Sequence, residues 1–240
     1  MPNITNFFED ILKNKTKITN ASSGIGFEDN IKAYLRKHSI NSIAMDDKIL
    51  AKYLKEIKPL IQAKSGNTLI ENTLYKQTQA TFGDMYKEFY IWQPFGTQDY
   101  PDFLIFSENK IWSVEIKYST KNKQKPLWNG NLPKQNALYI FGSFEKRDLT
   151  FFRGEDILPE NERIMLLDFW AALDEVKNEW EEKFSKNIGN KSVANSYGFQ
   201  PYIRKAYFQG KNFNKDAEVD FFKNKNRSTL EQNLIAFTKT

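Results

Sequence analysis

The sequence contains no cysteine and a single histidine, His38. The absence of cysteine excludes disulfide bonds, thiolate zinc sites and cysteine nucleophiles. One histidine gives no support to histidine-based zinc sites or to Ser-His-Asp catalysis. The GxxxxGK[ST] motif is also absent, so this sequence encodes no ATP-driven motor.

Long apolar runs are missing as well. No stretch of about 18 apolar residues occurs, so the sequence predicts no transmembrane helix and no membrane partner. The N-terminal stretch MPNITNFFEDILKNK carries acids early and has neither the apolar core nor the cleavage site of a signal peptide. Together with the lack of cysteine, these features favour a cytoplasmic protein.

The composition is that of a globular chain with some excess of positive charge. Hydrophobic residues make up 40% and charged residues 27% of the 240 residues, which fits one domain with a large core. The formal net charge is +5, which permits a polyanionic partner without requiring one. Lysines gather after residue 116, whereas acids gather in residues 155–182. An ordinary solvated surface is the alternative explanation of these lysines.

Apolar periodicity predicts helices in the first part of the chain and strands in the middle. Helices are expected at residues 4–14, 27–37, 44–62 and 68–89, with Pro59 kinking or ending the third. Strands are expected at residues 103–106, 111–118, 138–141 and 149–152. An amphipathic helix follows at residues 161–186, and its apolar stripe is expected to be core. This order predicts an α/β or α+β fold with a central mixed β-sheet flanked by helices.

The second strand of the expected hairpin carries the most informative side chains. Alternation places Glu115 and Lys117 on one face of that strand and its apolar residues on the other. Asp102 begins the partner strand after Pro101, which cannot extend the ladder. Pairing across the hairpin can therefore bring the Asp102 carboxylate toward Glu115. Asp99 lies close in sequence and is the alternative acid.

Two neighbouring carboxylates repel each other unless they share a proton or bind a cation. With no histidine or cysteine nearby, such oxygen ligands suit Mg²⁺, which keeps water molecules and takes further ligands from a phosphate. A lysine two residues beyond the second acid can position the attacking water. Hydrolysis of a phosphodiester requires these groups.

The pattern Pro101-Asp102 followed by Glu115-Ile116-Lys117 resembles the signature of the PD-(D/E)xK nucleases. The resemblance covers residues 100–117 and implies a restriction-endonuclease-like core. It implies Asp102 and Glu115 as metal ligands, Lys117 as the catalytic lysine and the main-chain carbonyl of Ile116 as a further ligand. The alternative is a surface hairpin with one exposed Glu–Lys pair.

Many members of this family add an acid from an early helix. The stretch Gly24-Ile25-Gly26-Phe27-Glu28 resembles that element, which implies Glu28 as an additional metal ligand. The alternative for Glu28 is an acid at a helix start, where the helix dipole favours negative charge.

A polar loop follows the motif and is a candidate DNA-contacting surface. Its candidate residues are Lys121, Lys123, Lys125, Trp128, Asn129, Asn131, Lys134, Gln135 and Asn136. Asn and Gln can pair with adenine, and Lys can reach guanine or phosphate. The stretch around Trp128-Asn129 also resembles one found in some type II restriction enzymes. The alternative is a long surface loop with Trp128 as its packing anchor. Arg204 and Lys205 are a second candidate contact, in a C-terminal stretch whose aromatics are equally explained as core.

These features predict a type II restriction endonuclease, which hydrolyses double-stranded DNA at a specific sequence with Mg²⁺ and, by the resemblance, leaves 5′-phosphate ends. We expect a homodimer, because a palindromic site mirrors a two-fold axis, and the resemblance implies a cognate DNA methyltransferase in the same system. The single nuclease domain would comprise a helical part (1–90), a catalytic β-meander (91–155) and a helix with a DNA-contacting C-terminal part (156–240). The alternatives are a repair nickase or junction resolvase on the same scaffold, and a non-catalytic DNA-binding module.

Overall fold

The computed structural model describes residues 3–43, 48–62, 88–107, 110–121, 123–128, 132–188, 197 and 219–239. Two compact units are distinguished in the chain. The first comprises residues 1–127, 133–157 and 209–240, and the second comprises residues 128–132 and 158–208. The C-terminal part expected from residue 156 is therefore divided between the two units. No helix in the described residues is long and apolar enough to cross a membrane.

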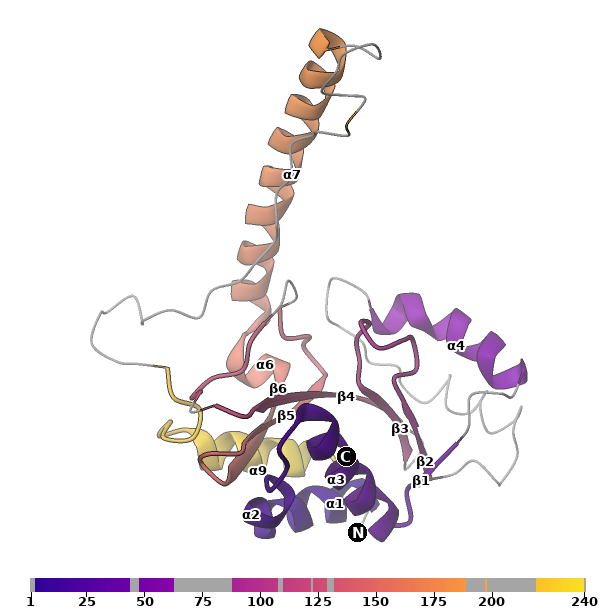
Figure 1. The fold of residues 1–240 in the computed structure, drawn as a ribbon, viewed down its shortest axis with the longest axis vertical. Coiled ribbons are helices and arrows are strands. Elements are labelled where there is room, and N and C mark those ends of the chain that lie inside the picture. Colours follow the sequence, from indigo (N-terminus) through magenta and orange to yellow (C-terminus); the bar gives the residue numbers. More distant parts are fainter. Residues whose placement is uncertain are drawn as a thin grey trace. The chain divides into compact units, whose positions relative to one another are not determined.

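Helices occupy the N-terminal part of the chain and return after the last strand (Figure 1). They are α1 (Asn3–Lys13), α2 (Lys15–Ile18), α3 (Gly24–Lys37), α4 (Lys48–Ile61), α6 (Gly154–Ile157), α7 (Glu160–Ile188) and α9 (Arg227–Phe237). The predicted helices at 4–14, 27–37 and 161–186 are confirmed within a few residues. Pro59 lies inside α4, which ends shortly after it at Ile61. Residues 68–87 of the helix expected at 68–89 lie outside the described residues. Its last two residues are not helical, because Glu88 lies in a bend and Phe89 begins a strand.

Within the part of the chain that the structure describes, six strands form one mixed sheet in the order of the chain. They are β1 (Asn41–Ser42), β2 (Phe89–Trp92), β3 (Phe103–Ser107), β4 (Lys110–Ser119), β5 (Leu138–Ser143) and β6 (Asp148–Arg153). The four predicted strands are confirmed, and the central mixed sheet flanked by helices is confirmed with them. The predicted meander is wrong at one connection, because β4 and β5 pair in parallel. Parallel neighbours need a crossover, which explains the length of the polar loop at residues 120–137.

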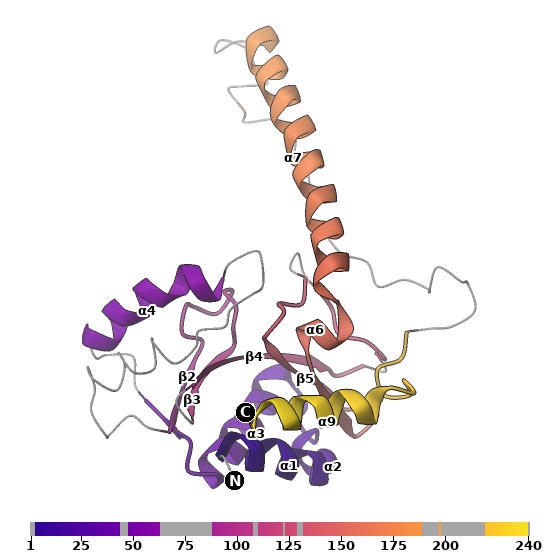
Figure 2. The same ribbon diagram turned by 180° about the vertical axis from the view of Figure 1, so that it is seen from behind.

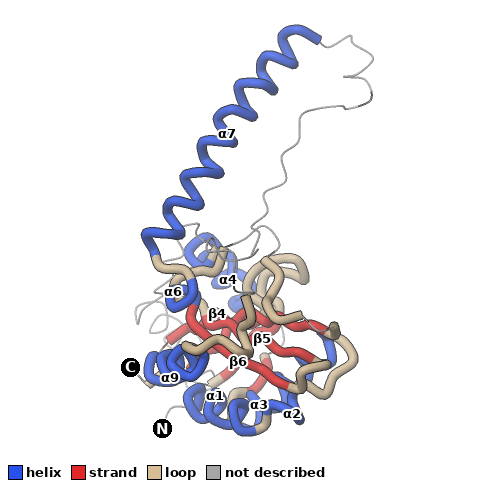
Figure 3. Tube along the Cα trace, turned by 90° about the vertical axis from the view of Figure 1, so that its left-hand side faces the viewer, coloured by secondary structure: helices blue, strands red, loops and turns tan. Residues whose placement is uncertain are grey.

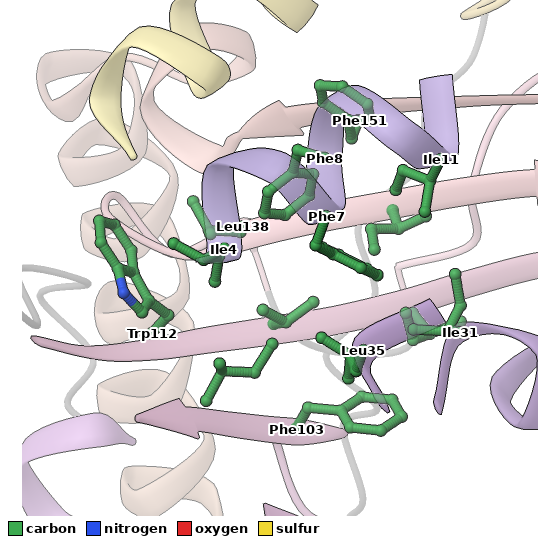
Figure 4. Close-up of a cluster of buried hydrophobic side chains, with 14 of the residues drawn as sticks. Ile4, Phe7, Phe8, Ile11, Ile31, Leu35, Phe103, Trp112, Leu138 and Phe151 are labelled. Atoms are coloured by element: carbon green, nitrogen blue, oxygen red, sulfur yellow. The ribbon is translucent and has the colours of Figure 1, made fainter. Parts of the chain in front are cut away.

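Helices cover both faces of this sheet (Figures 2 and 3). On one face α1, α3 and α9 pack over the strands, and α1 places Ile4, Phe7, Phe8 and Ile11 beside Leu138 and Phe151 (Figure 4). On the other face α4 packs Leu54, Ile57 and Ile61 against Phe89, Leu104 and Phe106. Side chains of β2, β3 and β4 are thus buried on both faces of the sheet.

The apolar stripe of α7 is not core, contrary to the prediction. Val176 is 51% exposed and Trp180 is 58% exposed. Periodicity predicts the face of a helix on which apolar residues gather, but it carries no information about what covers that face. Ion pairs of i,i+4 spacing along α7, such as Lys177–Glu181 at 2.8 Å, support the helix where buried contacts do not.

Candidate active site

The β3–β4 hairpin brings Asp102 and Glu115 face to face. Phe103 pairs with Val114, so the residue before β3 lies opposite Glu115. The Asp102 main-chain N–H donates a hydrogen bond to Glu115 Oε2 at 3.2 Å. The Ile116 N–H donates to Asp102 Oδ2 at 2.7 Å. β3 begins only at Phe103, so it has no main-chain acceptor for the Ile116 N–H. The Asp102 side chain accepts this hydrogen bond instead.

Lys117 lies on the same side of β4 as Glu115, as alternation predicts. Its Nζ lies 2.8 Å from Glu115 Oε1, and the two side chains are only 23% and 15% exposed. Val114 and Ile116 point to the opposite side, into the core beneath α1 and α3. The three motif residues therefore form a half-buried cluster, which the alternative of an exposed surface pair does not describe.

The electrostatics of Asp102 are unusual for an aspartate. Burial of the carboxyl is the main cause that raises the pKa of Asp102, and the negative charge of Glu115 adds to it, bringing the pKa to about 7. The hydrogen bond from Ile116 and the charge of Lys117 oppose this rise. Asp102 and Glu115 repel each other in this half-buried position. A shared proton or a bound cation would therefore stabilise the pair.

Asp99 does not take part in this cluster. Its side chain is 46% exposed and its Oδ2 lies 2.7 Å from Lys58 Nζ. Asp102, and not the alternative Asp99, is the acid that faces Glu115.

Glu28 approaches the pair from α3. It lies beyond the first turn of that helix, and the N-terminal capping bond is made by Ser23, whose side chain accepts from the Gly26 N–H at 3.1 Å. Partial burial is the main cause that raises the pKa of Glu28, and the charge of Glu115 contributes. Glu28 in turn contributes to the raised pKa of Asp102. The structure therefore brings Glu28 into the field of both motif acids, which a helix-start role alone does not explain.

Trp92, at the end of β2, is a site residue that no motif in the sequence indicates. Its Nε1 donates to Glu28 Oε2 at 2.8 Å, and the Lys32 Nζ lies 3.3 Å from the centre of its ring. Trp92 pairs with Phe103 on β3, which places it next to Asp102. Only the strand pairing shows this, since Trp92 and Glu28 are separated by 64 positions in the sequence.

The polar loop holds its candidate DNA contacts in different environments. Lys121 and Lys123 are exposed, and Lys125 is partly exposed. Trp128 is 8% exposed, as expected of a packing anchor. Asn129 and Asn131 lie outside the described residues, as do the second candidate contacts Arg204 and Lys205.

Lys134, at the end of the loop, turns inward. Its Nζ donates to the Gln62 carbonyl at 3.1 Å, and its main-chain N–H donates to the Tyr139 hydroxyl at 2.8 Å. Gly154 permits this path, because a Cβ there would come within 1.9 Å of the Lys134 carbonyl oxygen. Lys134 thus ties the loop to the end of α4, while its neighbours Gln135 and Asn136 are partly buried.

The atoms of this site that could bind a metal ion are all oxygens. The N–H and the C=O of a residue in an extended strand point to the same side, so the Ile116 carbonyl faces the edge where its N–H meets Asp102. Carboxylate and carbonyl oxygens are the ligands that Mg²⁺ accepts, with water completing the shell. Among the described residues no group of three or more His, Cys, Asp or Glu could hold a metal ion. A cation here would accordingly take two carboxylates and fill its remaining positions from main chain and water.

Models of protein families, curated proteins and solved structures give no match to this chain. What this site can do is inferred from its own geometry and charge.

Proposed function

We propose that this chain is a Mg²⁺-dependent DNA endonuclease of the PD-(D/E)xK type, with a restriction-endonuclease-like core, and that it acts as a type II restriction endonuclease. The observation that carries the proposal is the facing pair Asp102–Glu115 with Lys117 on the same side of β4. The order of the motif in the sequence and the sheet that positions it both agree with this class.

Each residue of the cluster has a separate task in this proposal. Asp102, Glu115 and the Ile116 carbonyl hold the cation, and Glu28 is the further carboxylate beside them. A bound Mg²⁺ would supply positive charge against the oxygens of the phosphodiester and an ordered shell of water. Lys117, kept in place by Glu115 at 2.8 Å, positions the attacking water and offsets negative charge as the phosphorus–oxygen bond breaks.

The wider setting follows from the same class. Double-stranded DNA is the substrate, and the exposed Lys121 and Lys123 lie just beyond the end of β4, where they can contact the backbone of DNA held at the site. We expect a homodimer acting in the cytoplasm beside a methyltransferase of the same specificity, with products that carry 5′-phosphates.

The test is cleavage of long unmethylated DNA. Wild-type protein, Asp102→Ala and Lys117→Ala are incubated with Mg²⁺ or with EDTA, and Asp99→Ala serves as a matched control because its acid lies three residues away and outside the cluster. The proposal is supported if the wild type and the control give discrete fragments with Mg²⁺ and the other two variants do not. Sequencing the fragment ends then gives the recognition sequence.

Other outcomes point elsewhere. A smear of fragments would indicate a less specific nuclease instead of a restriction enzyme. Single-strand nicks would indicate a nickase. DNA binding without cleavage in Mg²⁺ or Mn²⁺ would overturn the enzymatic proposal and favour a binding module.

A further inference from the structure

Two lysine-rich segments that are distant in the sequence meet at one end of the sheet. The first is Lys121-Asn122-Lys123-Gln124, after β4, and the second is Lys223-Asn224-Lys225-Asn226, before α9. The Phe221 N–H donates to the Gln124 carbonyl at 2.8 Å, which brings the two segments together. We propose that they form one surface that binds the phosphate backbone of duplex DNA. This inference rests on the proposed function for its ligand, because it names where the substrate of that site is held.

The second segment is anchored on the face of the sheet that carries Lys117. Lys117 of β4 pairs with Phe141 of β5, so their side chains lie on the same face. The Phe141 ring stacks on Phe222 with 5.0 Å between the ring centroids, and it meets Phe221 edge-on at 6.0 Å. These rings hold the second segment beside β5, the strand next to the one that carries the motif lysine.

The first segment is fixed to the end of β4. The hydroxyl of Ser119, the last residue of that strand, donates to the Lys121 carbonyl at 2.7 Å. Lys121 follows Lys117 by four residues, so at most about 13 Å separates their Cα atoms. Successive phosphates of one DNA strand are about 3.4 Å apart along the helix axis, so one duplex can contact both lysines.

Exposed positive charge outweighs exposed negative charge on this surface. The four lysines of the two segments are exposed, and none of them forms an ion pair with another residue that the structure describes. The turn between β5 and β6 lies beside them, because the Phe144 N–H donates to the Ser119 carbonyl at 2.9 Å. This turn adds the exposed Arg147 and one exposed acid, Glu145. Like charges so close together repel one another, and a bound polyanion relieves that repulsion.

The acid within the second segment's turn does not cancel this charge at the surface. The Asp220 side chain is only 10% exposed, and its Oδ2 lies 3.7 Å from Lys146 Nζ. Its Oδ1 accepts the N–H groups of Phe222 at 2.8 Å and Lys223 at 3.1 Å. Asp220 therefore shapes the turn from inside and leaves the lysines that follow it to face solvent.

The experiment measures binding of a short fluorescent duplex to the full chain by anisotropy, in EDTA and over a range of salt concentrations. Lys223→Gln/Lys225→Gln should make the slope of log binding constant against log salt less steep by about 1.8, since each phosphate contact contributes about 0.9. We expect its Kd to rise by about tenfold or more at low salt, equally for unrelated duplex sequences. Lys121→Gln/Lys123→Gln should give changes of the same size.

The matched control removes the same charge from the other side of the sheet. Lys37 ends α3 and Lys239 follows α9, and their side chains are 58% and 48% exposed. Lys37→Gln/Lys239→Gln should keep the wild-type slope and a Kd within about twofold of the wild type, because salt screens distant charges. Wild-type slope and Kd in Lys223→Gln/Lys225→Gln, or an equal loss in the control, would overturn the proposed surface.

The failure of this surface and the failure of the nuclease proposal can be distinguished. If the wild type cleaves DNA and Lys223→Gln/Lys225→Gln binds the duplex as the wild type does, only the surface is lost. If both lysine pairs are needed for binding but no cleavage occurs with Mg²⁺ or Mn²⁺, the surface stands and the nuclease proposal fails. A wild type that binds no duplex DNA at low salt would overturn both.

Discussion

Asp102→Asn is expected to make the folded protein more stable at pH 8. Burial and the neighbouring Glu115 raise the pKa of Asp102 from 3.8 to about 7. Since a tenfold change in an equilibrium corresponds to about 1.4 kcal/mol, ionising Asp102 costs about 4 kcal/mol more in the folded protein than in the unfolded chain. Asparagine stays neutral, and its Oδ1 can still accept from Ile116. Repacking around the amide reduces the gain, so we expect the free energy of unfolding to rise by about 2 to 4 kcal/mol.

The gain should depend on pH in a defined direction. Between about pH 4 and pH 7 the folded wild type binds more protons than its unfolded chain, so its stability falls as the pH rises through this window. Asp102→Asn lacks this loss, and the two proteins should converge near pH 4. Urea unfolding in EDTA at pH 4.5 and pH 8 measures the difference, with Asp99→Asn as the exposed control, for which we expect a change below about 1 kcal/mol.

Equal stability of wild type and Asp102→Asn at pH 8 would refute this reasoning, as would a difference that stays the same at pH 4.5. Mg²⁺ provides a second check. At about 100 times its Kd it should stabilise the wild type by about 2.7 kcal/mol, and it should stabilise Asp102→Asn far less.

Four other substitutions test the packing. Gly142→Ala is expected to destabilise the protein by about 1 to 3 kcal/mol, because the added Cβ would lie 2.6 Å from the buried Phe27 ring; an unchanged urea midpoint would contradict this contact. Arg227→Ala should cost about 3 to 5 kcal/mol in chemical unfolding, since its half-buried guanidinium joins two carboxylates and a carbonyl of β6, and a loss below about 1 kcal/mol would show that these bonds contribute little. Trp180→Ala should change stability by no more than about 0.5 kcal/mol, whereas Phe151→Ala should cost about 3 to 5 kcal/mol; a large loss for Trp180→Ala in calorimetry would mean that α7 is covered in solution.

The motif acids could be predicted because the hairpin is local. A short turn and strict alternation determine which side chains of β4 share a face, and the register of one hairpin then places Asp102 opposite Glu115. The exposed Glu–Lys alternative disagrees with the burial of the two side chains, which are 23% and 15% exposed, and the sequence pattern does not predict that burial.

The parts of the site that escape prediction depend on contacts distant in sequence. Trp92 reaches Glu28 because β2 lies beside β3, and no periodicity indicates which strands become neighbours. Lys134 has the composition of a DNA contact, yet its environment turns it inward toward Gln62. In α7 the pattern of apolar residues gave the helix correctly and its burial wrongly.

The different lengths of β3 and β4 have a consequence for observing the site. β3 does not extend as far as Ile116 of β4. The Ile116 N–H therefore donates to a side chain, Asp102 Oδ2, and not to the main chain of a neighbouring strand. Its exchange with deuterated solvent depends on that one carboxylate, unlike the amides within the ladder. A cation that draws Oδ2 away would remove the acceptor of this proton. The Ile116 amide is therefore a natural reporter of site occupancy, readable residue by residue without any label at the site.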